Sequence, residues 1–179
     1  LETDFPYCVG GIVRGKKEGY KEAEAFVTTR SGQEIKLYLT PVKRFRQYSV
    51  VKHPLVSNQL QAGQPLEEDE IAFISIKYTE NKTTLHSSDA AYPTLGNLAP
   101  LELLGGADFP YKLEIYLMKD DEVTGGYQGI WTPKWTDLEN ADEIEFHVVE
   151  VGAPTTDEAS ITLLNDIQTY SGQIKPEIK

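Results

Sequence analysis

The chain has a single cysteine, Cys8, among its 179 residues. An intramolecular disulfide is therefore excluded, and this favours a reducing compartment such as the cytoplasm. No histidine or lysine stands beside Cys8 in the sequence to activate its thiol. We interpret Cys8 as a structural cysteine rather than a nucleophile.

Long hydrophobic runs are also missing. No segment approaches the roughly 20 apolar residues that a membrane-spanning helix needs, so we expect no membrane span. The first residues, LETDFPYCVGG, lack the basic and apolar segments of a secretory signal peptide. Because the chain starts at Leu1 rather than Met, a signal peptide removed earlier is still compatible with the sequence, and the localisation stays open.

Basic residues are scarce, with 17 Lys and Arg against 28 Asp and Glu, which gives a formal charge of −11. Such a chain repels phosphate backbones, so we expect no nucleic-acid partner. The acids are dispersed, which is typical of a soluble, solvated surface. Hydrophobic residues make up 40 % and charged residues 25 %, which indicates one globular domain over residues 1–179.

The sequence has few residues for catalysis. His86 is followed by Ser87, Ser88 and Asp89, but the members of a hydrolytic triad normally come from separate segments, and no Gly-x-Ser-x-Gly elbow is present. We therefore interpret Ser87, Ser88 and Asp89 as residues of a turn. No glycine-rich phosphate loop is visible either, so we predict no catalytic residue and no cofactor.

The strand expected near residues 143–151 offers a possible metal site. Glu143, Glu145 and His147 are spaced so that they share one strand face. Strong metal sites need three or four converging ligands. A solvated outer face is therefore the expectation, with no bound metal.

The tetrapeptide Asp-Phe-Pro-Tyr occurs twice, from Asp4 and from Asp108. The residues after each copy resemble each other loosely, which predicts a structural repeat of residues 4–42 and 108–151. Two pairs of strands agree in the phase of their apolar residues, which is the physical condition for equivalent strands. The matched sets are Tyr7, Val9, Gly11 and Val13 with Tyr111, Leu113, Ile115 and Leu117, and Ile35, Leu37 and Leu39 with Ile144, Phe146 and Val148.

The predicted fold is therefore all-β and mainly antiparallel, a β-sandwich or flattened barrel built from two three-stranded meanders. Residues 43–107 connect them, with strands near 43–51 and 69–81, loops over 53–69 and 81–97, and a short helix over 99–106. A helix and tail come last, over 155–179. Thr155 and Glu158 have capping-box spacing. Ile161, Leu164 and Ile167 lie on the expected apolar face, joined by Leu163 and Tyr170 at its flank, with a loose tail after the helix.

Two surfaces are candidate binding sites. Trp131 and Trp135, with Tyr127, can form an aromatic platform for a sugar or a partner, although packing in the core is the competing interpretation. Arg44, Arg46 and Tyr48 alternate in a basic stretch and can meet an anion or an acidic partner. Alternatively, this stretch is an edge strand whose charged side chains prevent unwanted pairing with other strands.

The sequence thus favours a non-catalytic binding or assembly module that acts through protein–protein contacts, with a homo-oligomer among the partners it allows. A carbohydrate- or small-ligand-binding β-sandwich is the first alternative, and a hydrolase or metal-dependent enzyme is the second. No motif in the chain identifies a family.

Overall fold

The computed structural model describes residues 7–28, 34–93 and 100–179. The predicted class is confirmed, because the chain is mainly antiparallel β with a helix near its C-terminus. The elements in chain order are β1 Gly11–Gly15, β2 Ala23–Val27, β3 Val42–Phe45, β4 Gln47–Val56, β5 Gln59–Leu60, β6 Gln64–Pro65, β7 Glu70–Glu80, β8 Thr83–Tyr92, β9 Leu101–Leu104, β10 Tyr111–Lys119, β11 Glu122–Trp131, α1 Trp135–Asn140, β12 Glu143–Glu150, α2 Asp157–Ser171 and β13 Glu177–Ile178.

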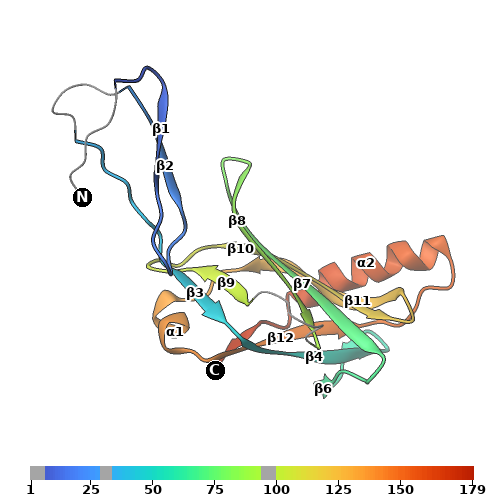
Figure 1. The fold of residues 1–179 in the computed structure, drawn as a ribbon. Helices are drawn as coiled ribbons and strands as arrows, with labels where there is room; N and C mark the ends of the chain where they lie inside the picture. Colours follow the sequence, from blue (N-terminus) through green and yellow to red (C-terminus); the bar gives the residue numbers. More distant parts are fainter. Residues whose placement is uncertain (1–6, 29–33, 94–99) are drawn as a thin grey trace.

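One large sheet forms the body, in the order β5-β4-β12-β11-β10-β7-β8 (Figure 1). Its pairs are antiparallel except for β4 and β12, which run parallel. The sheet curls without closing, and the Tyr48 hydroxyl on β4 donates to the Ala91 carbonyl on β8 at 3.2 Å. A ribbon of β3 and β9 packs beside it. The arrangement is sandwich-like, as expected.

The core lies on one face of this sheet because apolar residues alternate along its strands. In β10 the residues Tyr111, Leu113, Ile115 and Leu117 are fully buried, while Lys112 points to solvent. The Tyr111 hydroxyl accepts from the Leu104 N–H at 2.8 Å. Burial raises the pKa of Tyr111 above its ordinary value. This phenol therefore ties β9 to the first residue of β10.

Helix α2 lies along the sheet near β11 and β12 (Figure 1). Its cap is Thr156, whose side chain accepts from the Ala159 N–H, one residue later than the predicted capping box. Leu163 and Ile167 face the sheet, whereas Ile161 and Leu164 of the predicted face point outward. In the described ranges, no helix combines the length and apolar character needed to cross a bilayer.

Three local expectations are wrong. Residues 101–104 form strand β9 instead of a helix, because Leu101 and Leu103 are buried in alternation and pair with β3. Much of the expected loop at 81–97 is strand β8, the partner of β7. The tail is held as β13, which pairs with β12.

The two Asp-Phe-Pro-Tyr segments do not have equivalent surroundings. Val9 is 90 % exposed, whereas its predicted counterpart Leu113 is fully buried. Leu37 is partly exposed outside any strand, whereas Phe146 is buried in β12. Asp4 to Pro6 of the first segment lie outside the described residues. Two like sheets pressed together are therefore not what these residues form.

Candidate functional site

The first part of the chain forms a projecting arm, defined here as residues 7–41 apart from 29–33. Its hairpin of β1 and β2 extends away from the main sheet, as Figure 1 shows. Residues 34–40 run back beside it toward β3, and an alanine side chain built at Gly15 would contact Leu37 and Leu39. The arm is thus a thin layered structure separate from the core.

The arm contributes nothing to that core. Among the described residues, none before Phe45 is buried, and Phe45 is the first member of the hydrophobic cluster. Ile12 and Phe26 are cross-strand partners on the outer face of the hairpin, and they are 47 % and 79 % exposed. Tyr7, Val9 and Tyr38 are also exposed. A chain segment with this many bare apolar side chains is typical of an interaction surface.

The base of the arm is fixed to the body by backbone hydrogen bonds. The Lys21 N–H donates to the Thr40 carbonyl at 2.8 Å, and the Val42 N–H donates to the Gly19 carbonyl at 2.8 Å. The Lys21 ammonium also donates to the Leu85 carbonyl on β8. The attachment is therefore firm at the base, while the outer end, which carries Val9, Ile12 and Phe26, projects.

The chain's charge divides shortly after the arm, at residue 46. Residues 1–46 hold nine Lys and Arg against six Asp and Glu, whereas residues 47–179 hold eight against 22. The formal charges of the two segments are therefore +3 and −14. Lys16 and Lys17 are exposed beside the turn that joins the base of the arm to Thr40 and Val42, and Arg46 is exposed just after the arm. The described residues of the arm hold five Lys and Arg against four Asp and Glu, so most of the excess positive charge comes from Lys43, Arg44 and Arg46 just after it. The arm is therefore apolar at its end, and the cations gather where it joins the body.

The strongest concentration of acid lies at the far end of the body, and we name it the acidic rim. Its six residues are all exposed: Glu67, Glu68, Asp69, Asp120, Asp121 and Glu122. Lys119 at the end of β10 bonds Glu67 at 2.6 Å and Asp69 at 3.2 Å, which gathers the two segments. Hydrogen bonds from Lys119 and Lys52 lower the pKa of Glu67, which favours the charged form of this carboxylate.

Arm and rim stand at opposite ends of strand β10. The arm meets the body beside Leu104, which is bonded to Tyr111 at the start of β10. The rim surrounds Lys119 at its other end. Nine residues of antiparallel strand separate these ends by roughly 27 Å. The two ends of this axis therefore carry different surfaces, the arm at one end and the acidic rim at the other.

The structure brings the predicted aromatic residues together only in part. Trp131 is buried at the end of β11, where its ring packs against Tyr111 and Phe146. Trp135 begins helix α1 and packs beside Gly105. The two indoles are therefore not on one strand face and form no shared exposed platform.

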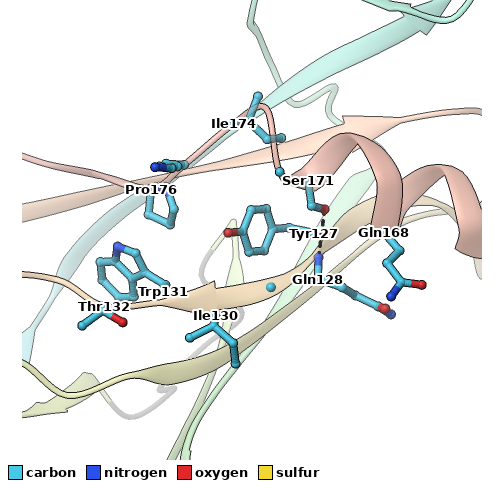
Figure 2. A pocket seen from close by; sticks show the side chains of 12 residues that line it. Tyr127, Gln128, Ile130, Trp131, Thr132, Gln168, Ser171, Ile174 and Pro176 are labelled. Atoms are coloured by element: carbon cyan, nitrogen blue, oxygen red, sulfur yellow. Dashed lines mark hydrogen bonds between the residues drawn. The ribbon is translucent and has the colours of Figure 1, made fainter.

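Trp131 and Tyr127 do line a pocket of about 510 Å³ between β11 and the segment after α2 (Figure 2). Tyr127 points its phenol into this space, and burial raises its pKa. The Gln128 N–H donates to the Ser171 hydroxyl oxygen at 3.0 Å, which fixes α2 against the strand. Gln168 and Lys175 add polar groups to the lining.

Arg44 and Arg46 are exposed, and Tyr48 is buried. The two arginines line a shallow depression of about 330 Å³, and the Arg44 guanidinium bonds the Glu102 carboxylate at 2.8 Å. Tyr48 instead joins β4 to β8 through its bond to Ala91. These three residues therefore do not share one binding face.

The His86 segment has a structural role in the described contacts. The His86 Nε2 atom lies 2.8 Å from the Glu102 carbonyl, and the Ser88 hydroxyl oxygen accepts from the Glu102 N–H at 2.9 Å. Both side chains thus connect β8 to β9. This arrangement leaves no histidine aimed at a serine here.

His147 is only 14 % exposed, and Glu145 is 20 % exposed, so they are not on the solvated face that the sequence suggested. Burial, and secondarily His53, lower the pKa of His147, which favours its neutral form. Glu177 from β13 completes a group whose ligand atoms all lie within 4.8 Å of one another. The sequence could not place Glu177 there, because the tail was expected to be loose.

The arm was missed as a site for a related reason. Its strands have ordinary alternation, and only the charge division at residue 46 marks it as different from the body. Comparison of this chain with protein families, with curated proteins and with solved structures finds no match, so its function has to be inferred from its own geometry.

Proposed function

We propose that this chain is a non-catalytic assembly module whose copies join head to tail, with the arm of one copy docked on the acidic rim of the next. The observation that carries the proposal is the arm, a hairpin that leaves Ile12 and Phe26 uncovered while burying no residue of its own.

An isolated two-stranded hairpin is marginal in water, since it cannot bury enough apolar surface. The arm's outer face therefore gains most from a partner that covers it. Both outer edges of the β1–β2 pair also lack a strand partner among the described elements, so main-chain pairing with a partner strand is open to it.

The charge pattern supports a second copy as that partner. The cations at and just after the base of the arm complement the acidic rim, and complementary potentials speed and orient association. The two surfaces lie at opposite ends of β10, so a contact between them is heterologous. Such contacts produce rings when the rotation closes and filaments when it does not.

Replacing Phe26 with glutamate is expected to weaken self-association by at least tenfold, because the new charge must be desolvated when a partner covers the outer face of the arm. Sedimentation over a range of protein concentrations measures the effect. Ile161→Glu is the matched control, since Ile161 is 63 % exposed on α2, away from the arm. A native chain that stays monomeric, or an equal loss in the control, would contradict the proposal.

A mixing experiment tests the head-to-tail geometry itself. One variant carries Phe26→Glu in the arm, and the other carries Asp120→Lys with Asp121→Lys in the rim. Each alone should be monomeric, whereas a mixture should form a dimer that grows no further, because one intact arm and one intact rim remain. Failure of the mixture to pair would overturn the arrangement.

The pocket of Figure 2 supports a second candidate function, binding of a neutral saccharide. Its volume falls within the range of small-molecule sites. Aromatic rings offer a stacking surface, and the Gln128 and Gln168 amides can bond hydroxyls.

In a Trp135→Phe variant, Trp131 becomes the sole tryptophan, so its emission reports on the pocket. We expect titration with neutral oligosaccharides to shift that emission, and Gln168→Ala to weaken the response several-fold. Unchanged emission with every sugar would remove this candidate and leave the assembly proposal untouched.

A further inference from the structure

Two carboxylates face each other where the C-terminal strand joins the sheet. Glu145 of β12 and Glu177 of β13 are register partners. Like charges directly opposite on neighbouring strands destabilise the pair. His147 lies two residues beyond Glu145 on the same face of β12, and its ring nitrogen approaches both acids. A cation between these three side chains would turn the repulsion into attraction.

The hydrogen bonds around His147 determine which of its nitrogens carries a proton. The His53 Nδ1 atom lies 3.0 Å from the Gln61 carbonyl, which can only accept, so His53 is protonated there. In neutral His53 the Nε2 atom is then an acceptor, and it lies 2.9 Å from His147 Nδ1. His147 therefore donates from Nδ1, and its Nε2 atom carries a lone pair.

That lone pair points at the two acids. His147 Nε2 is buried and has no hydrogen-bond partner among the described residues. It lies 3.6 Å from a Glu145 oxygen and 4.0 Å from a Glu177 oxygen, which is too long for hydrogen bonds. Buried polar atoms without partners are rare in native proteins and call for an explanation.

We propose that Glu145, His147 and Glu177 form a binding site for one divalent transition-metal ion, with Zn²⁺ as the best-suited member of the class. Imidazole nitrogen and carboxylate oxygen are both Zn²⁺ ligands with bonds of about 2.0–2.2 Å. In a tetrahedron of that size, neighbouring donors lie about 3.4 Å apart. The separations of 3.6 and 4.0 Å therefore need to contract by about 0.2 and 0.6 Å, and the two carboxylate oxygens, which lie within 4.8 Å of each other, must also move closer.

The surrounding groups fit this role. His53 and the Gln61 carbonyl hold the His147 ring in the required tautomer, as outer partners of metal-bound histidines commonly do. Glu177 is exposed, so the ion has a route in from solvent and a water can complete the coordination. The site would also fasten β13, which pairs with β12 over only two residues.

One positive charge competes for the same place. The Lys179 ammonium bonds the Glu145 carboxylate at 2.8 Å, and it must move aside when the ion binds. Glu143, on the same strand face, bonds Ser49 at 2.8 Å and does not belong to the ligand set. Lys179→Met is therefore expected to tighten metal binding several-fold.

Calorimetric titration of the tag-free chain with Zn²⁺ tests the site. We expect one ion per chain, a tenfold or greater loss of affinity in Glu177→Gln, and no binding at the site in His147→Gln. The His86→Gln variant is the matched control, because His86 lies on β8 outside this cluster. Its affinity should equal that of the native chain.

Thermal unfolding gives a second readout that does not rely on His147 variants folding. A ligand that binds only the folded chain raises its melting temperature. Zn²⁺ should therefore raise the melting temperature of the native chain and of His86→Gln, and much less that of Glu177→Gln. Substoichiometric binding, or equal stabilisation of Glu177→Gln, would overturn the proposal.

Discussion

Replacing Lys52 with methionine is expected to lower the free energy of unfolding by about 3–5 kcal/mol, the usual cost of leaving a buried charge without its partner. The Lys52 side chain is 3 % exposed, and Glu70 is 1 % exposed. Lys52 Nζ lies 2.8 Å from Glu70 and 2.8 Å from Glu150. Methionine keeps the length of the side chain, so the loss isolates the charge. Urea unfolding with an unchanged m-value measures it.

The electrostatics of Lys52 support this expectation. Burial alone would lower its pKa, but hydrogen bonds and charge interactions with Glu150 and Glu70 raise it above the ordinary value. A raised lysine pKa means that the stabilisation is fully present below the unfolded value of about 10.4. It is lost only as the pH rises through the higher folded pKa. The contribution of the Lys52 charge to the native chain should therefore be constant across the neutral range.

A compensating variant separates charge from packing. Glu70 also accepts from the Glu67 N–H at 2.7 Å, and glutamine can keep that bond. Lys52→Met with Glu70→Gln removes both buried charges and should recover more than half of the lost stability. If the double variant is no better than Lys52→Met alone, the cost comes from packing instead of the unpaired carboxylate.

Strand parity was predictable where one face of a strand is buried along its whole length. Tyr111 to Leu117 alternate without interruption, and the structure buries that set. The alternation of apolar residues also located β7. Capping-box spacing located the N-terminal cap of α2 to within one residue. These elements can be predicted from short stretches of sequence, because alternating apolar residues and a capping hydroxyl are both visible in neighbouring residues.

Position in the sheet was not predictable by the same means. Val9 and Leu113 have the same phase but opposite burial, since parity says which residues share a face and not what covers it. β8 contains Ser87, Ser88 and Asp89, which resemble a turn, yet pairing with β7 makes the segment a strand. Tertiary context overrides such weak local preferences.

The candidate sites depend on the same missing information. Trp131 was a plausible exposed aromatic until the sheet placed it against Phe146. Glu177 joins His147 only because the tail pairs with β12. Both outcomes require contacts between segments far apart in the chain, which no local pattern specifies.

Gly126→Ala is expected to destabilise the fold by about 3 kcal/mol or more, because the added methyl group would collide with a neighbouring strand. An alanine Cβ at this position would lie 2.1 Å from the Ile115 carbonyl oxygen, whereas ordinary carbon–oxygen contacts are about 3.3 Å. The obstacle is backbone in the middle of β10, which cannot rotate away. Thermal or urea unfolding gives the magnitude.

The position of Gly126 in the sheet explains why the neighbouring strands cannot move apart to accept a side chain. Gly125 and Gly126 are the two β11 residues in the described register with β12. The Val151 and Gly152 N–H groups extend this junction by donating to the Thr124 carbonyl. The pairing of β10 with β11 shifts just beside Gly125 and Gly126, after Leu117, and the displaced strand brings its backbone close to both neighbours. Gly172→Ala is the control, because a Cβ there meets nothing closer than 3.9 Å in a helical conformation. If the two variants are equally stable, β10 and β11 can move apart at Gly126, and the close contact with the Ile115 carbonyl does not limit the side chain there.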